Sequence, residues 1–224
     1  MKKISMIVLT VLTFGMTSCD MDKMPYDAIP AEEALTTIVG FEEARAGIYS
    51  VYLGLTGGSY VLAPEVQADA FNAVADFSNK YGELHRWTFE STNSTVETIW
   101  ANCYAAIGRA NFFIDGVGKI DENPEIELTE IQKQQINVYE GEAYFTRAYC
   151  YFYLATLFCR DYDVATAANT PGLPLQVKYE PQLAATQYPG RSSLEDTYKQ
   201  ILEDLEEAEV RIETAKNGIA DYDR

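Results

Sequence analysis

Histidine is almost absent from this 224-residue chain, because His85 is its single copy. A zinc site built on two histidines is therefore excluded, and a histidine-based catalytic triad could use only His85. The chain also lacks a Gly-x-Ser-x-Gly motif and a glycine-rich phosphate-binding loop. Its 34 acidic residues include no pair that stands out as a hydrolytic pair. We therefore expect no enzyme, no metal site and no cofactor.

Basic residues are scarce too, with 17 Lys and Arg against 34 Asp and Glu, which gives a formal net charge of −17. An acidic surface repels phosphate backbones and anionic lipid headgroups, so we expect no nucleic-acid partner. Long apolar runs are also missing after the first eighteen residues, so no segment there could span a bilayer.

The amino-terminal residues have the pattern of a bacterial lipoprotein signal. Lys2 and Lys3 precede about ten mostly apolar residues, and small residues then lead directly to Cys19. This pattern predicts a signal peptide at 1–18, cleavage before Cys19 and acylation of its thiol, with 19–40 as a tether. The alternative is an ordinary signal peptide with a chance cysteine. Attachment to a membrane is expected through this lipid anchor only.

Three cysteines remain for the folded part, Cys103, Cys150 and Cys159, and their spacing matches no zinc motif. Cys150 and Cys159 are nine residues apart, which places them on opposite faces of a helix. Buried free thiols are the expected state, with one disulfide as the alternative.

Helical periodicity dominates the rest of the chain. Phe41, Ala44, Ile48 and Tyr52 predict a first helix that glycines end after Leu53, whereas residues 64–93 have no clear period. Ser94 and Glu97 predict a capping box for a second helix. The apolar stripe of that helix includes Trp100, which we expect in the core. A lack of charge over residues 148–159 predicts that the next helix is central and buried.

That central helix is expected to run from a capping box of Thr129 and Gln132 to about Phe158, with Arg147 paired to Glu142 or Glu140. Prolines predict a long ordered loop at 160–191. Ser192 with Glu195 would cap the last helix. The apolar stripe of that helix is Leu194, Tyr198, Ile201, Leu202, Leu205 and Ile212.

The sequence has no clear β-hairpin pattern, so the predicted fold is all-α, made of antiparallel helix pairs. The predicted helix starts at Ser94 and Thr129 lie close to the tetratricopeptide period of about 34 residues. Other α-bundles remain an alternative.

Several segments together resemble the SusD/RagB family of outer-membrane nutrient-binding lipoproteins. They are FEEARAGIYSVYL at 41–53, IWANCYAAIGRANFFI at 99–114, EAYFTRAYCYFYLATLF at 142–158, Gly-Leu-Pro-Leu at 172–175, and 191–212. The chain departs from the family where Cys159-Arg160-Asp161 replaces a glycine-aspartate pair. The resemblance implies a tetratricopeptide-like α-α superhelix with long irregular loops. Residues 41–224 would be its amino-terminal part, with the family's carboxy-terminal part missing.

The resemblance also implies a function. Such a lipoprotein lies on the outside of the outer membrane, binds a nutrient such as an oligosaccharide, and passes it to a TonB-dependent, SusC-like β-barrel transporter. Sugars stack on exposed aromatic rings and bind polar side chains at their hydroxyls. In the polar, aromatic segment 69–90, Tyr81 and Trp87 are the stacking candidates, with Asn79 and Arg86 as polar partners.

Two alternatives stay open for the whole chain and one for Trp87. The chain could be a helical-repeat scaffold lipoprotein that binds proteins, or a non-functional fragment of a longer nutrient-binding protein. Trp87 could instead pack beneath its own loop as a small satellite core.

Overall fold

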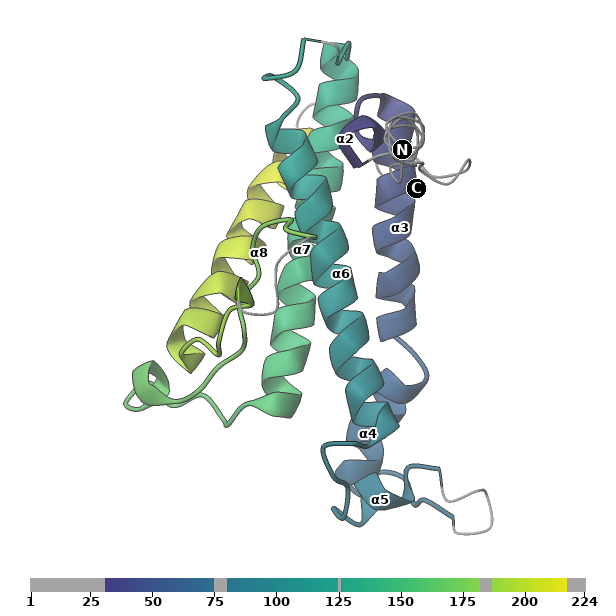
Figure 1. The fold of residues 1–224 in the computed structure, drawn as a ribbon, viewed down its shortest axis with the longest axis vertical. Helices are drawn as coiled ribbons and strands as arrows, with labels where there is room; N and C mark the ends of the chain where they lie inside the picture. The colour runs from purple at the N-terminus through teal and green to yellow at the C-terminus, as the bar shows by residue number, and fades with distance from the viewer. Residues whose placement is uncertain (1–30, 75–79, 125, 182–186, 217–224) are drawn as a thin grey trace, which may run out of the picture. The chain divides into compact units, whose positions relative to one another are not determined.

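The computed structural model describes residues 31–74, 80–124, 126–181 and 187–216, and what it describes is helical (Figure 1). The elements are α2 (Ala31–Ala34), α3 (Ile38–Leu55), α4 (Ser59–Gln67), α5 (Gly82–His85), α6 (Ser94–Gly118), α7 (Glu130–Phe158), the short 3-10 helix η1 (Ala167–Asn169) and α8 (Leu194–Lys216). Among these residues, pairing of strand type is limited to one isolated bridge between Pro171 and Ser193. The all-α prediction is confirmed.

Helix α7 is the centre of the bundle. Figure 1 shows α6, α7 and α8 running antiparallel in chain order, with α3 on the other side of α6 from α8. Helices α3, α6 and α8 each pack against α7. Its predicted role as the central helix is therefore confirmed, and Tyr151 and Leu154 are among its fully buried side chains.

A small residue allows α8 to approach α7 closely. A Cβ atom at Gly141 would lie 3.0 Å from the Ile212 side chain and 3.1 Å from the Ala208 carbonyl oxygen. Those distances are tighter than ordinary van der Waals contact. Glycine at position 141 thus lets the two helix backbones come together.

One of the three predicted capping boxes forms. The Thr129 hydroxyl accepts a hydrogen bond from the Gln132 N–H, and the Gln132 side chain accepts one from the Thr129 N–H. The box at Ser94 is wrong, because the Asn93 side chain accepts the N–H groups of Thr95 and Val96 instead. Asn93 is also held from outside α6, since its amide donates to the Glu83 carboxylate.

The predicted cap of α8 is wrong by one residue. Ser193, not Ser192, accepts the Asp196 N–H at 3.0 Å and donates to the Asp196 carboxylate at 2.7 Å. The Ser192 hydroxyl is already used, because it donates to the Leu173 carbonyl oxygen at 2.7 Å. A tertiary contact therefore decided between two adjacent serines.

The predicted partners of Arg147 are also wrong. Arg147 pairs with Asp204 of α8, with Nη2 2.6 Å from Oδ1 and Nε 2.9 Å from Oδ2. Burial lowers the pKa of Arg147, but the bonds to Asp204 more than offset this, so that the pKa is raised. Glu142 and Glu140 instead pair with Arg45 of α3 and Arg211 of α8. Glu142 lies on another face of α7, whereas Glu140 faces α8 as Arg147 does but lies two turns away, beside Arg211.

The other segments follow the sequence only in part. Residues 64–93 are not wholly irregular, because α4 extends to Gln67 and α5 forms one turn. The segment 160–191 is an extended connection, in its described residues, that contains only η1. On α8, Leu194 and Ile201 are buried as expected, whereas Leu202 and Leu205 are exposed.

The cysteines of the described part are free thiols. Cys103 and Cys150 are fully buried, as predicted, and Cys159 is half-buried. The adjacent Cys103 thiol and burial raise the pKa of Cys150 well above its ordinary value, which keeps that thiol protonated. Within the described ranges, no helix is long and apolar enough to cross a membrane.

Candidate functional site

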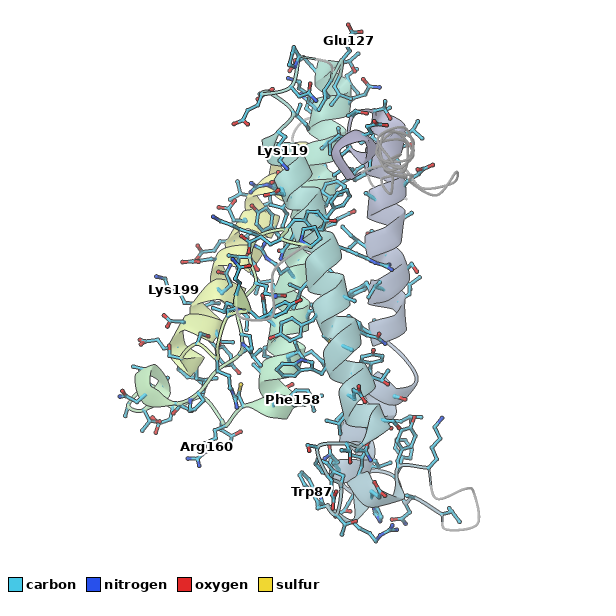
Figure 2. All side chains as sticks on the ribbon, viewed as in Figure 1. Trp87, Lys119, Glu127, Phe158, Arg160 and Lys199 are labelled. Atoms are coloured by element: carbon cyan, nitrogen blue, oxygen red, sulfur yellow. The ribbon has the colours of Figure 1, made fainter. Side chains whose placement is uncertain are left out.

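The candidate site lies on the connection between α4 and α6, at the end of the bundle where α5 sits (Figure 2). Of the four residues proposed to bind a ligand, Tyr81, Arg86 and Trp87 are described here. Asn79 and the lipidation candidate Cys19 lie outside the described residues.

Trp87 presents its indole to solvent. The residue is 65% exposed, so it does not pack beneath its loop. Its orientation is nevertheless fixed, because Nε1–H donates to the Gln67 carbonyl oxygen at 3.2 Å. The Phe89 ring supports it at a centroid distance of 6.2 Å. A large ring that is both exposed and held in place fits a stacking surface for a ligand.

The backbone around Trp87 is strained. Among the described residues, the non-glycine residues with positive φ are Asp69, Tyr81 and Trp87, at 58°, 62° and 55°. All three lie on the α4–α6 connection. Left-handed backbone at a bulky side chain costs about 1–3 kcal/mol and persists only where surrounding contacts enforce it. Such strain is concentrated at functional sites more often than elsewhere.

Tyr81 supports the loop rather than forming a second exposed stacking surface beside Trp87. It is half-buried and packs against the main hydrophobic core, and its hydroxyl is 2.9 Å from the Ser59 hydroxyl. The Lys80 ammonium lies 5.2 Å from the centre of its ring. Arg86 is exposed and directly precedes Trp87.

His85, the single histidine, has a structural position. Its Nδ1 lies 3.2 Å from the Val66 carbonyl oxygen and 3.7 Å from the Asp69 carboxylate. It thereby links α5 to α4. In the part of the chain described here, no group of three His, Cys, Asp or Glu side chains is placed to hold a metal ion.

A groove of about 460 Å³ shares two lining residues with the contacts of Trp87, although Trp87 itself does not line it. Gln67, which holds the indole N–H, and Phe89, which supports the ring, both line it. The groove is lined by Ala63, Gln67, Leu84, Phe89, Ser91, Val96, Glu97, Ile99, Trp100, Leu157 and Phe158. Apolar walls with a few polar groups at the rim are typical of a small-molecule site.

Trp100 packs against the main hydrophobic core without being fully buried, so the expected core position is confirmed only in part. It is half-buried, with its ring 4.9 Å from the Tyr104 ring and 5.0 Å from that of Phe158. It lines the groove and also a second hollow of about 270 Å³, which Tyr188 and Pro189 border from the long connection. Helical period placed Trp100 on the apolar stripe, but Trp100 lies at the edge of that stripe, next to the buried Ile99.

Sequence reasoning missed Phe89, Trp100 and Phe158 as members of this site. Trp100 and Phe158 belong to apolar helix stripes, which ordinarily mean burial. The only signal that could have found Phe89 is its position two residues after Trp87, on the same polar, aromatic segment.

Comparison with known proteins gives one consistent family. A SusD-like family model, described as "Starch-binding associating with outer membrane", matches residues 31–214. SusD-like protein P2 of Formosa agariphila is 26% identical over 200 residues, which cover 83% of this chain and 37% of that protein. The chain thus spans less than two fifths of the length of this relative.

Solved structures agree on the fold. A SusD superfamily protein from Bacteroides thetaiotaomicron superposes with a TM-score of 0.58 at 19% identity, over 78% of this chain and 37% of its own. A SusD-like carbohydrate-binding protein from Bacteroides vulgatus gives 0.55 at 22% identity, over 77% and 35%. The tetratricopeptide-like helical prediction is therefore confirmed. With its family model matched from residue 31 to residue 214, the chain belongs to the SusD-like family.

Proposed function

We propose that this polypeptide is the amino-terminal part of a surface lipoprotein that binds an oligosaccharide and passes it to a TonB-dependent, SusC-like transporter. The observation that carries the proposal is Trp87, whose indole is exposed although its N–H and its neighbour Phe89 fix its orientation. Holding a ring in place before binding lowers the entropy cost of capturing a flexible sugar chain. The family description, starch binding at the outer membrane, supports the same ligand class.

The proposed binding mode combines stacking with hydrogen bonds. The apolar face of a sugar ring would lie on the indole of Trp87, and Arg86 and Asn79 would bond its hydroxyls. Tyr81 would keep the loop in shape from below, since its hydroxyl is tied to Ser59. The adjoining groove, with Gln67, Ser91 and Glu97 among its lining residues, could receive the next sugar unit.

Replacement of Trp87 by alanine tests this mode. We expect Trp87→Ala to weaken binding of the best glycan from a screen by about tenfold or more, because a central aromatic contact is lost. Trp87→Phe should lose less, since a ring remains. Isothermal titration calorimetry on the complete gene product would measure both dissociation constants.

Tyr162→Ala is the matched control, because Tyr162 is also an exposed aromatic residue but lies on the 160–191 connection. It should bind the glycan as the parent protein does. If Trp87→Ala binds the glycan with unchanged affinity, Trp87 is not the stacking surface. A screen in which peptides bind and glycans do not would favour a protein-binding scaffold.

Lipidation of Cys19 is the second part of the proposal. With residues 1–18 removed and two or three acyl chains on Cys19, the tether 19–40 would hold the helical domain at the outer surface. Cys19→Ala should release the protein from the membrane fraction and abolish growth on the bound glycan, because the binding protein would no longer be held beside its transporter. Mass spectrometry of the mature amino terminus gives the direct answer, and an unacylated cysteine there would contradict the proposal.

A further inference from the structure

Trp100 borders two cavities, the groove of about 460 Å³ and a separate hollow of about 270 Å³. The walls of the hollow come from α6 and from two arms of the connection between α7 and α8. They are Trp100, Tyr104, Pro174, Gln176, Tyr188 and Pro189. We call this cavity the Tyr188 hollow. Because the two cavities share Trp100, one chain-like ligand can occupy both.

The ring of Trp100 is held in place where the two cavities meet. The Tyr104 ring lies 4.9 Å from it, and the Phe158 ring meets it edge-on at 5.0 Å. Burial raises the pKa of Tyr104, so its hydroxyl stays protonated and donates to the Pro174 carbonyl oxygen at 2.8 Å. This bond ties the first arm of the connection to α6.

The first arm, residues 171–178, is fixed through its main chain. The Gln176 N–H donates to the Tyr151 hydroxyl at 2.7 Å, and the Gln176 carbonyl oxygen accepts bonds from Tyr151 and Asn111, both at 2.8 Å. These bonds use both main-chain groups of Gln176, so its side-chain amide is what it can offer a ligand. An amide can donate to one sugar hydroxyl and accept from another.

The second arm presents an exposed aromatic ring. Tyr188 is 58% exposed, and the following Pro189 restricts its backbone to extended conformations. Arg191 anchors the arm, because its guanidinium donates to the Gly172 carbonyl oxygen at 2.6 Å and to that of Phe158 at 3.1 Å. Tyr188 is therefore accessible on a restrained backbone, which suits a stacking surface.

The chemistry of the Tyr188 hollow favours a neutral sugar. Its described lining residues carry aromatic rings, proline rings and one amide, and no charged group. Aromatic rings pack against the C–H face of a sugar ring, while an amide and phenolic hydroxyls bond its hydroxyl groups. An acidic sugar would meet no cation among these lining residues, and the net charge of −17 would repel it.

We propose that the Tyr188 hollow is a second glycan subsite, which binds a neutral sugar unit further along the chain that stacks on Trp87. The inference rests on the proposed function and narrows its substrate to neutral oligosaccharides long enough to reach both aromatic residues. A short sugar occupies the Trp87 site alone. A longer one gains the second contact without a second loss of translational freedom, so affinity rises with chain length.

The dependence of affinity on chain length tests this subsite. The probes are malto-, cello-, xylo- and mannooligosaccharides, each as disaccharide and hexasaccharide, titrated by calorimetry into the complete gene product. For a series that binds, we expect Tyr188→Ala to weaken the hexasaccharide about fivefold and the disaccharide less than about twofold. Trp87→Ala should weaken both. Tyr188 is exposed, so its replacement should leave the fold intact.

Tyr162→Ala is again the matched control. Tyr162 is 44% exposed on the same connection, but its ring contacts Tyr198 of α8 at 4.9 Å and does not line the hollow. It should change neither affinity. If Tyr188→Ala affects both probes equally, or neither, while Trp87→Ala weakens them, the second subsite is refuted and the proposed function stands. If no series binds, or if Trp87→Ala changes neither affinity, the proposed function fails as well.

Discussion

Asp204→Ala is expected to lower the free energy of unfolding by about 3–5 kcal/mol, because it leaves the Arg147 guanidinium buried without its counter-ion. Arg147 and Asp204 are 4% and 1% exposed, so water cannot replace the lost carboxylate. The pair also joins α7 to α8, through two guanidinium–carboxylate bonds of 2.6 and 2.9 Å. Urea unfolding followed by circular dichroism would measure the change.

Glu203→Ala is the matched control for this variant. Glu203 is the preceding residue of α8, is exposed, and lies 3.8 Å from Lys199 one helical turn away. An exposed pair of this kind contributes little, so the control should change the stability by less than about 0.5 kcal/mol. Arg147→Met combined with Asp204→Leu should recover much of the loss, because an apolar pair needs no counter-ion. Equal stabilities of Asp204→Ala and Glu203→Ala would refute the assignment.

Gly172→Ala is the second substitution with a large expected effect, a loss of about 3 kcal/mol from overpacking. A Cβ atom at this position would lie under 3.0 Å from the Thr197 hydroxyl and from the Ser193 carbonyl oxygen. Neither atom can move away easily. Thr197 is fully buried and its hydroxyl accepts the Leu173 N–H, while the Ser193 carbonyl accepts the Thr197 N–H at the start of α8.

Gly108→Ala separates this clash from a general effect of glycine. Gly108 lies inside α6, and a Cβ atom there would meet nothing within 4 Å. Alanine in that helix should therefore raise the stability by about 0.5–1 kcal/mol, since the unfolded chain loses conformational freedom. Thermal unfolding of the two variants should shift the midpoint in opposite directions. If both midpoints shifted in the same direction, the close approach at Gly172 would not be the cause of the lower stability of Gly172→Ala.

The long helices α3, α6, α7 and α8 were predictable because each of them follows from local patterns, whereas α4 and α5 were not predicted. The apolar period of α3, α6 and α7 and the capping box at Thr129 act within a few residues of the chain. The first capping residue of α6 was not predictable from the same kind of pattern. Asn93 and Ser94 are both good caps, and the contact of Asn93 with Glu83 of α5 favours Asn93.

The candidate site was predictable only in part. Trp87 was selected because a tryptophan in a polar segment without helical period has no local reason to be buried. Its orientation depends on the Gln67 carbonyl oxygen, which is twenty residues away in the chain. Trp100 was assigned to the core because periodicity reports which face of a helix is apolar. It does not report how far around the helix the neighbouring elements cover that face, since Ile99, the preceding residue, is buried.

The sequence by itself determined that this protein is helical, where its long helices lie, and which family its motifs resemble, because these depend on periodicity, capping and residue order. Only the tertiary structure decided that Arg147 binds Asp204, that Trp87 is fixed yet exposed, and that Tyr52 of α3 contacts Phe145 and Tyr149 of α7. Those features depend on which distant segments come together. That choice is made by packing over the whole domain rather than within any one helix.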